Sequence, residues 1–393
     1  MNKSVFLPAT RASLLLACCA FFSGCEDDSF KEDFEAQQNN SPSYSVGRES
    51  AKKEALNAVK AFFSQSSTRE IGSVDALLSD AGSSDTLAYV CNFKGDAGFA
   101  IVVADERVKD KVIACIDQGS FDGNSDNPGF TFLLNNIKAY AEQQVAESKN
   151  LKSTNALKSG GAGNTVQLPT TQVGPLIRTA WSQGSPYNAF VDDYPGGGKY
   201  YTGCTITAIA QLIGYYNQPG ISMMPEMTAK RHAWELDDFH KTWVGILFRS
   251  IWNEVPKIHQ GLATGVAVED GLAYLSRYGH YTQGRRYYTK STIMTNVGNQ
   301  HPVIMSSSSG GGHTWLVDGY RVERFYYTSN PNDVQEGDTY FHINWGWDGD
   351  CDGWFAAGCF NVDAAVEFDE PHFNYNRNYT SGLYTYLAWP NNQ

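Results

Sequence analysis

Two residues in unusual local settings are suited to covalent chemistry. Cys204 follows Gly203 and precedes a run in which apolar residues recur every three or four positions, which predicts a buried helix over 205–216. A cysteine in the first turn of a helix is favoured as the nucleophilic thiolate, because the helix N-terminus carries partial positive charge. Gly203 would let a ligand backbone approach closely. The alternative for a lone cysteine is a small buried core residue.

A nucleophilic thiol needs a base, and His313 has the most suitable setting of the eight histidines. It follows a serine run and a glycine run ending at Gly312, and it opens a predicted strand. The glycines leave room for substrate at Gly312, while the strand fixes the imidazole. Pairing with a protonated histidine lowers a thiol pKa from about 8.5 to roughly 3–4.

Two other segments offer groups that could complete such a site. Alternation along a predicted strand puts Asn344 on the same face as His342, and we expect the Asn344 amide to accept a ring N–H of His313 and fix its tautomer. Trp345 would keep water off that bond. Gln183 could donate a side-chain N–H which, with the backbone N–H of Cys204, stabilises an oxyanion.

The four segments occur in a fixed order that resembles the streptopain-type cysteine peptidases. They read Trp-x-Gln-x-x-Pro-Tyr-Asn, Gly-Cys-x-x-Thr-Ala-x-Ala-Gln, Gly-Gly-His-x-Trp-x-x-Asp-Gly-Tyr and Asn-Trp-Gly-Trp. The resemblance implies a papain-like fold made as an inactive precursor. It also implies that Cys204 is the nucleophile, His313 the proton acceptor and Gln183 the oxyanion donor, with Asn344 and Trp345 orienting and shielding His313.

The sequence between residues 89 and 121 resembles the inhibitory propeptide of the same family. We therefore expect an α+β protein in which a papain-like catalytic domain, with a helical part and an antiparallel β-sheet part, follows a small α+β propeptide. The expected organisation is a signal peptide at 1–25, a flexible spacer at 26–45, the propeptide at 46–147, a linker with the activation cleavage at 148–168 and the catalytic domain at 169–393.

Hydrophobic periodicity predicts the main elements. In the propeptide we expect helices over 46–66 and from residue 127 onward, with strands over 86–93, 98–104 and 112–116. The polar, lysine- and glycine-rich segment 148–165 lacks such a pattern and is typical of a site of proteolytic nicking. In the catalytic domain we expect helices over 205–216 and 246–259, and strands downstream of residue 301.

The N-terminus predicts export. Basic residues precede a short apolar run over 12–22, too short to span a bilayer but typical of a signal peptide. The Ser-Gly-Cys ending at Cys25 resembles a lipobox, in which Cys25 would be lipidated and anchor the chain to a membrane. The alternative is ordinary signal cleavage and a freely secreted product.

Composition limits the partners. With 30 Lys plus Arg against 42 Asp plus Glu, the net charge is −12, which disfavours nucleic acid. No apolar stretch reaches the 18 residues of a membrane span.

Five cysteines lie outside the signal region, so in an exported chain at least one is unpaired. Cys351 could bridge to Cys359 and Cys91 to Cys115, and the sequence settles neither pairing.

The expected reaction is peptide-bond hydrolysis in proteins or peptides, without a cofactor, inhibited by the chain's own propeptide. The resemblance implies a hydrophobic side chain at the second residue before the cleaved bond.

Asp348 departs from the family pattern, which has glycine after the second tryptophan. The segment 348–353 matches the opening of a calcium loop, but Cys359 stands where that loop needs glutamate, so no metal is expected. The alternatives are Cys–His amide hydrolysis or acyl transfer on a nonprotein substrate, and a non-catalytic binding lipoprotein.

Overall fold

The computed structural model describes residues 45–63, 67–78, 86–123, 127–155, 165–307, 312–360 and 382–391. The predicted signal peptide, Cys25 and nearly all of the predicted spacer lie outside these ranges. Within them, no helix is both long and apolar enough to cross a membrane.

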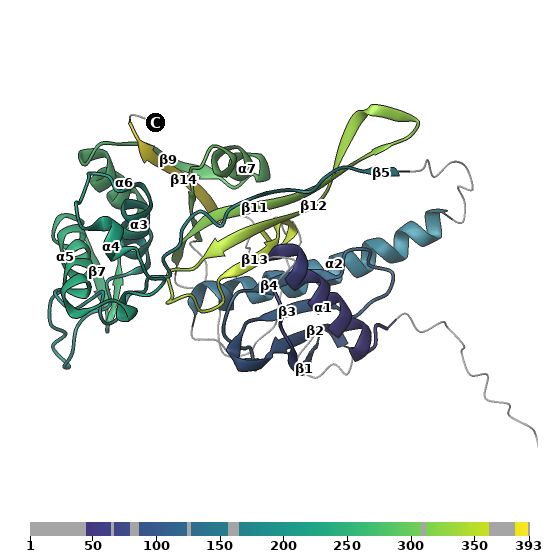
Figure 1. Ribbon diagram of the computed structural model, residues 1–393, viewed down its shortest axis with the longest axis horizontal. Helices are drawn as coiled ribbons and strands as arrows, with labels where there is room; N and C mark the ends of the chain where they lie inside the picture. The colour runs from purple at the N-terminus through teal and green to yellow at the C-terminus, as the bar shows by residue number, and fades with distance from the viewer. Residues whose placement is uncertain are drawn as a thin grey trace, which may run out of the picture. The chain divides into compact units, whose positions relative to one another are not determined.

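The N-terminal region forms an antiparallel sheet covered by helices (Figure 1). Its elements are α1 (Arg48–Phe62), β1 (Ile71–Leu78), β2 (Thr86–Phe93), β3 (Phe99–Val103), β4 (Val112–Ile116) and α2 (Pro128–Asn155). The buried face of α1 consists of Ala51, Ala55, Ala58, Val59 and Phe62, and α1 packs on β3 and β4. The predicted bounds of β2 and β4 are confirmed. Strand β1 was not expected, because it is largely exposed and carries little apolar alternation.

The segment expected as a linker is partly helical. Helix α2 continues to Asn155, and β5 (Thr165–Gln167) pairs with a strand of the catalytic sheet. The apolar pattern fades after residue 147 because only a helix face that packs on a core needs apolar residues. Residues 156–164 lie outside the described ranges.

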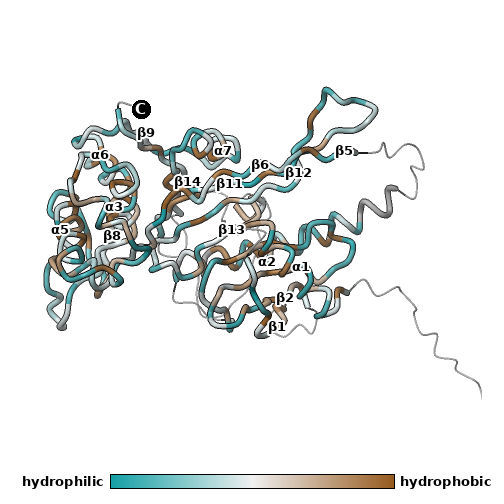
Figure 2. Tube along the Cα trace, viewed as in Figure 1, coloured by the Kyte–Doolittle hydropathy of each residue, from teal (hydrophilic) through white to brown (hydrophobic). Residues whose placement is uncertain are grey.

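Four helices form the helical part of the expected catalytic region, in which α3 contacts both α5 and α6 (Figure 1). They are α3 (Cys204–Tyr216), α4 (Met224–Met227), α5 (Asp238–Glu254) and α6 (Val268–Arg277), and the hairpin of β7 (Ile258–Gln260) and β8 (Ala263–Gly265) accompanies them. Figure 2 shows hydrophobic residues along α3, and nearly all of that helix is buried.

Helix α5 differs from the predicted range of 246–259. It begins earlier because the Asp237 side chain caps it by accepting the backbone N–H of His240 at 3.0 Å. It ends at Glu254, two residues before Pro256, whose ring cannot continue a helix.

The second part of the catalytic region is an antiparallel sheet in the order β13-β12-β11-β10-β14-β9. Its strands are β9 (His280–Tyr287), β10 (Val303–Ser307), β11 (His313–Tyr327), β12 (Asn330–Asn344), β13 (Gly353–Ala356) and β14 (Leu383–Pro390), with β6 (Thr171–Val173) on β11 and α7 (Lys290–Gly298) between β9 and β10. Strands β11 and β12 form a long hairpin (Figure 1) whose outer half is hydrophilic (Figure 2).

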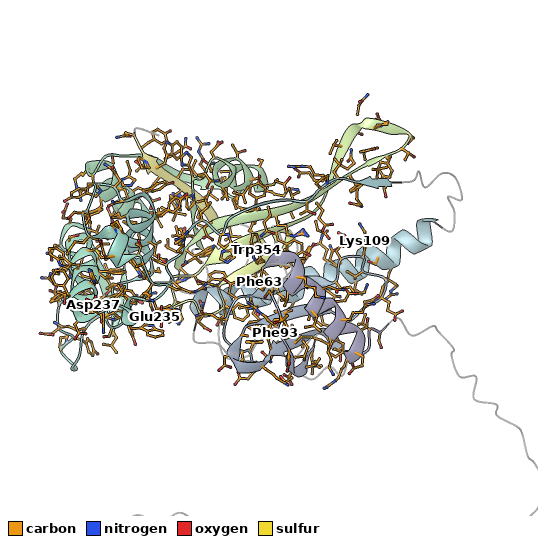
Figure 3. The ribbon with its side chains drawn as sticks, viewed as in Figure 1. Phe63, Phe93, Lys109, Glu235, Asp237 and Trp354 are labelled. Carbon is orange, nitrogen blue, oxygen red and sulfur yellow. The ribbon has the colours of Figure 1, made fainter. Side chains whose placement is uncertain are left out.

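One sheet joins the N-terminal region to the catalytic region, because β4 pairs with β13 in antiparallel register. Trp354 of β13, labelled in Figure 3, stacks on Phe62 of α1 with ring centroids 5.7 Å apart. The N-terminal domain and one face of the sheet thus share one hydrophobic core, while a second core lies between the helical part and strands β10, β11 and β14. The predicted α+β class with helical and β-sheet parts is confirmed.

Candidate active site

The thiol of Cys204 lies at the start of α3, as the sequence predicts. Gly203 precedes the helix with φ 92° and ψ 148°, a conformation that favours glycine. Its carbonyl accepts the Thr207 N–H at 3.1 Å and so begins the helix. The side chain of Cys204 is half-buried, facing the N-terminal end of the helix dipole.

His313 contacts this thiol. Burial of Cys204 raises its pKa, but a hydrogen bond and positive charge from His313, with hydrogen bonds from Thr314, outweigh burial and lower the pKa to about 7. A substantial fraction of Cys204 is therefore thiolate near neutral pH. Cys204 and His313 lie roughly a hundred residues apart in the sequence, and the fold brings their side chains into contact, as predicted.

Aromatic rings and one carbonyl hold the His313 imidazole. His313 is the first residue of β11, directly after Gly312, and is 5% exposed. Its Nε2 lies 3.0 Å from the backbone carbonyl of Trp345. The Trp315 and Trp345 rings lie 6.1 and 6.3 Å away, and the Trp347 ring lies edge-on at 6.3 Å. Trp345 therefore packs its ring against the imidazole and orients the imidazole with its backbone carbonyl.

The expected hydrogen bond between Asn344 and His313 is not the one the structure has. The Asn344 oxygen accepts from Gln211 Nε2 at 2.9 Å and from the Gly346 N–H at 3.1 Å, and its amide donates to the Thr179 carbonyl at 2.8 Å. The carbonyl of Trp345 takes the role expected of Asn344. Buried polar side-chain atoms form hydrogen bonds with the partners nearest to them. For Asn344 the nearest side-chain partner is Gln211, which lies on α3.

Sequence reasoning missed Gln211 as a site residue. It is fully buried, and its side-chain oxygen also accepts the Trp181 N–H at 3.1 Å and the Thr179 hydroxyl at 3.2 Å. The signal was a polar residue on the apolar helix that begins at Cys204.

Gln183 lies on a segment joined to the helix start. Its carbonyl accepts the Thr202 N–H at 3.0 Å, and the Thr207 hydroxyl donates to the neighbouring Ser182 carbonyl at 3.3 Å. These bonds hold the backbone of Gln183 next to the Gly203–Cys204 turn.

The two glycines expected to bind substrate have different surroundings. A Cβ on Gly203 would lie 2.5 Å from the Thr264 carbonyl, so the close approach at Gly203 is made by this chain's own backbone. Gly312 is exposed and has φ 79°. A Cβ on Gly312 would lie 3.6 Å from the Ser307 carbonyl, which is ordinary van der Waals contact.

The start of α2 covers the site. Asn127 caps this helix, accepting the N–H groups of Gly129 and Phe130 at 3.0 and 3.1 Å, and donates to the Asp350 carbonyl at 2.7 Å. Gly129 packs so closely that a Cβ there would lie 2.6 Å from His313 Cδ2 and would also overlap the Trp345 ring. The N-terminal domain therefore occupies the space over the imidazole.

A buried cluster of charges links the same two regions, and the sequence did not reveal it. His342 of β12 lies 2.6 Å from Asp318 and 3.3 Å from Asp117, which follows β4. Arg231 lies 3.5 Å from Asp117 and 3.8 Å from Asp352. Burial lowers the pKa of His342, but Asp318 and Asp117 outweigh it and raise the pKa to about 10. His342 is therefore a cation at neutral pH.

Neither disulfide that the sequence allowed is formed. Cys91, Cys115 and Cys359 are free buried thiols, and Cys351 donates to the Asp350 carboxylate at 3.6 Å. Burial raises the pKa of Cys91 to about 12 and also raises the pKa of the other two buried thiols. Cys204 is the described cysteine whose pKa is lowered. In the described ranges, no group of three or more His, Cys, Asp or Glu could hold a metal ion.

The site combines a thiol at a helix start, an imidazole at a strand start and an amide segment beside them. This combination is typical of papain-like cysteine peptidases, and here an N-terminal domain covers it. Two family profiles match the chain: the Peptidase C10 family at residues 181–238 and 224–355, and the Spi protease inhibitor at residues 45–141. The chain is a precursor of the streptopain type of cysteine peptidase, with an inhibitor-type domain before the catalytic domain.

Individual relatives agree with this assignment. The chain is 24% identical over 341 residues to the thiol protease/hemagglutinin PrtT of Porphyromonas gingivalis, covering 73% of this chain but only 36% of that protein. It is 24% identical over 327 residues to streptopain of Streptococcus pyogenes serotype M1, covering 70% of this chain and 75% of streptopain. A fragment of Prevotella intermedia prointerpain A has a similar fold, with a TM-score of 0.52 and 19% identity over 82% of this chain and 98% of the fragment.

Proposed function

We propose that the chain is an exported cysteine endopeptidase made as a zymogen, with Cys204 as nucleophile and His313 as acid and base. The observation that carries the proposal is the contact between the two side chains, which lowers the pKa of Cys204 to about 7. A thiol with this pKa is partly ionised at neutral pH, whereas an isolated buried thiol is not.

In the first half of the reaction, the proton of the Cys204 thiol passes to His313, and the sulfur attacks the carbonyl carbon of a peptide bond. The Gln183 amide and the backbone N–H of Cys204 stabilise the oxyanion. His313 then gives its proton to the leaving nitrogen, the C–N bond breaks, and an amine departs. The acyl group remains on Cys204 as a thioester.

In the second half, His313 takes a proton from water, and the hydroxide attacks the thioester. The C–S bond breaks, a carboxylic acid leaves, and the proton returns to the sulfur. Throughout, the Trp345 carbonyl orients the imidazole. We propose that Asn344 acts through it, because Asn344 fixes the backbone next to that carbonyl by bonding to Gln211 and Gly346.

The N-terminal domain, residues 46–147 in this proposal, acts as an intramolecular inhibitor. The packing of Gly129 against His313 and the Asn127–Asp350 hydrogen bond support this role. Cleavage within residues 148–168 would then release the catalytic domain, residues 169–393. Export through residues 1–25 and lipidation at Cys25 would place the enzyme at a membrane surface, with residues 26–45 as spacer. Gly312 and Gly203 would line the approach to the site, Gly203 through its backbone.

Expression of the full chain beside its Cys204→Ala variant tests the proposal. The unmodified chain should mature by cleavage and then degrade a denatured protein, while purified Cys204→Ala should do neither. Maturation and hydrolysis that persist in pure Cys204→Ala would refute the nucleophile. Cleavage of small amides without any cleavage of protein would favour the alternative of an amidase, and an unreactive Cys204 with no hydrolysis would favour a binding protein.

A further inference from the structure

Trp347, Asp348, His232 and Trp234 form a half-exposed corner of the catalytic region. This corner begins beside His313 and is not used in the mechanism above. Trp347 stands edge-on to the imidazole, with planes at 76°. The next residue, Asp348, donates its backbone N–H to the Trp181 carbonyl at 3.4 Å. Trp181 belongs to the segment that carries Gln183. The corner therefore lies where the segments of the proposed base and of the proposed oxyanion donor converge.

Asp348 occupies a backbone conformation that favours glycine. Its φ is 56°, which costs a residue with a side chain some stability. The carboxylate accepts hydrogen bonds from His232 Nδ1 at 3.0 Å and from Trp234 Nε1 at 3.2 and 3.3 Å. These bonds offset the backbone cost and fix the Trp234 indole at the corner.

Trp234 and Asp348 present an aromatic face and a negative charge to solvent side by side. The indole stacks on the His232 ring at 4.9 Å and 20°, yet 53% of Trp234 remains exposed. The Asp348 side chain is 44% exposed. Glu235 and Asp237, labelled in Figure 3, follow on the same segment and add negative charge. An exposed indole beside a carboxylate suits a side chain with an apolar stem and a cationic end.

The reaction places this corner on the leaving side of the substrate. His313 protonates the leaving nitrogen, so the residues after the cleaved bond lie on the His313 side of Cys204 and pass Trp347. In the precursor, Gln118 of the inhibitory domain donates to the Asp348 carbonyl at 3.0 Å. Polypeptide therefore already lies at this corner, and it leaves when that domain is released.

We propose that Trp234 and Asp348 form a subsite for a lysine or arginine side chain of the substrate, within the first three residues after the cleaved bond. This inference rests on the proposed function and deepens it. A cationic side chain would contact both the exposed indole and the half-exposed carboxylate. The two contacts together should favour a basic residue over an acidic one by about tenfold in kcat/KM.

Internally quenched peptides test the subsite. They are identical up to the cleaved bond and carry lysine, alanine or glutamate at one of the three following positions. The matured enzyme should show a kcat/KM for lysine about ten times that for glutamate at one position. The ratio should fall to about three in Trp234→Ala, which removes one half of the subsite, and to about one in Asp348→Gly, which removes the carboxylate and also the hydrogen bond that holds the indole. Glycine suits the φ of Asp348, so this variant should fold.

Trp243→Ala is the matched control, since Trp243 is another exposed tryptophan, on α5. It should keep the tenfold ratio. A ratio near one at all three positions in the unmodified enzyme, or a full ratio in both Trp234→Ala and Asp348→Gly, would overturn the subsite. A coumarin amide with no residue after the cleaved bond separates the two claims. If it is hydrolysed while the peptides show no basic preference, the subsite alone fails; if nothing is hydrolysed, the proposed function fails as well.

Discussion

Asp117→Asn should weaken the hold of the inhibitory domain on the catalytic region. The Asp117 carboxylate lies between His342 and Arg231, and its side chain is 13% exposed. Burial would raise the pKa of Asp117, but His342, Arg231 and Arg69 outweigh it and lower the pKa below its usual range. Asparagine keeps the volume of the side chain and removes the charge.

The magnitude follows from the cluster that remains. Breaking a buried ion pair by removing one partner costs about 3–5 kcal/mol. His342 keeps Asp318 at 2.6 Å and Arg231 keeps Asp352, so the lower end applies. A loss of about 3 kcal/mol raises the open fraction of the domain contact by roughly 100-fold.

Hydrogen exchange of the full chain with Cys204→Ala, which prevents self-cleavage, measures this opening. The β4 amides that pair with β13 should exchange roughly 100-fold faster in Asp117→Asn. Asp96→Asn is the control, because Asp96 is an exposed carboxylate in the same domain. Unchanged exchange at β4, or an equal increase in Asp96→Asn, would refute the reasoning.

The same cluster gives a pH dependence. Because the pKa of Asp117 is lowered in the folded protein, its contribution is complete at neutral pH and is lost as the pH falls below about 4. His342 has a raised pKa, so its contribution is complete below about 6.5 and is lost as the pH rises through about 10. After correction for intrinsic exchange rates, β4 protection should fall at both ends, and Asp117→Asn should flatten the acidic end. An acidic limb of equal size in Asp117→Asn would count against this assignment.

Two further substitutions probe the site. Gly129→Ala should push the start of α2 off His313 and speed maturation of the precursor, measured by the rate of cleavage, whereas Gly47→Ala has open space around its Cβ and should not; equal rates in the two variants would contradict the packing argument. Gln211→Leu should lower the free energy of unfolding in denaturant by about 1–3 kcal/mol, because it removes the acceptor of the buried Trp181 N–H and one of the two donors to the Asn344 oxygen, and a change below about 0.5 kcal/mol would contradict that role.

Sequence patterns predicted the elements that are apolar because they are buried. Strands β2 and β4 have the expected bounds and helix α3 begins one residue earlier than predicted, since each contributes most of its residues to a core. Strand β1 and the end of α2 contribute few buried residues, so hydrophobic periodicity could not reveal them. The start of α5 depends on the Asp237 cap, a local hydrogen bond that hydrophobic periodicity does not reveal.

The chemistry-bearing residues were predictable by type, but their hydrogen-bond partners were not. Cys204 and His313 stood out because a helix start and a glycine-flanked strand start are informative by themselves. Whether Asn344 bonds to His313 or to Gln211 depends on how close α3 approaches β12 in the folded chain. The cluster of Asp117, His342 and Arg231 likewise comes from three distant segments, and no sequence spacing signals it.

The most direct test of the account is the rate at which iodoacetamide alkylates Cys204 as a function of pH, in intact precursor with and without His313→Gln. The account predicts a midpoint at about 7 in the unmodified chain. In His313→Gln the midpoint should rise above the ordinary cysteine value of about 8.5, because burial raises the pKa and the hydrogen bond and positive charge of the imidazole no longer oppose it. A midpoint that is the same in both chains would contradict the pairing of thiol and imidazole on which the proposed function rests.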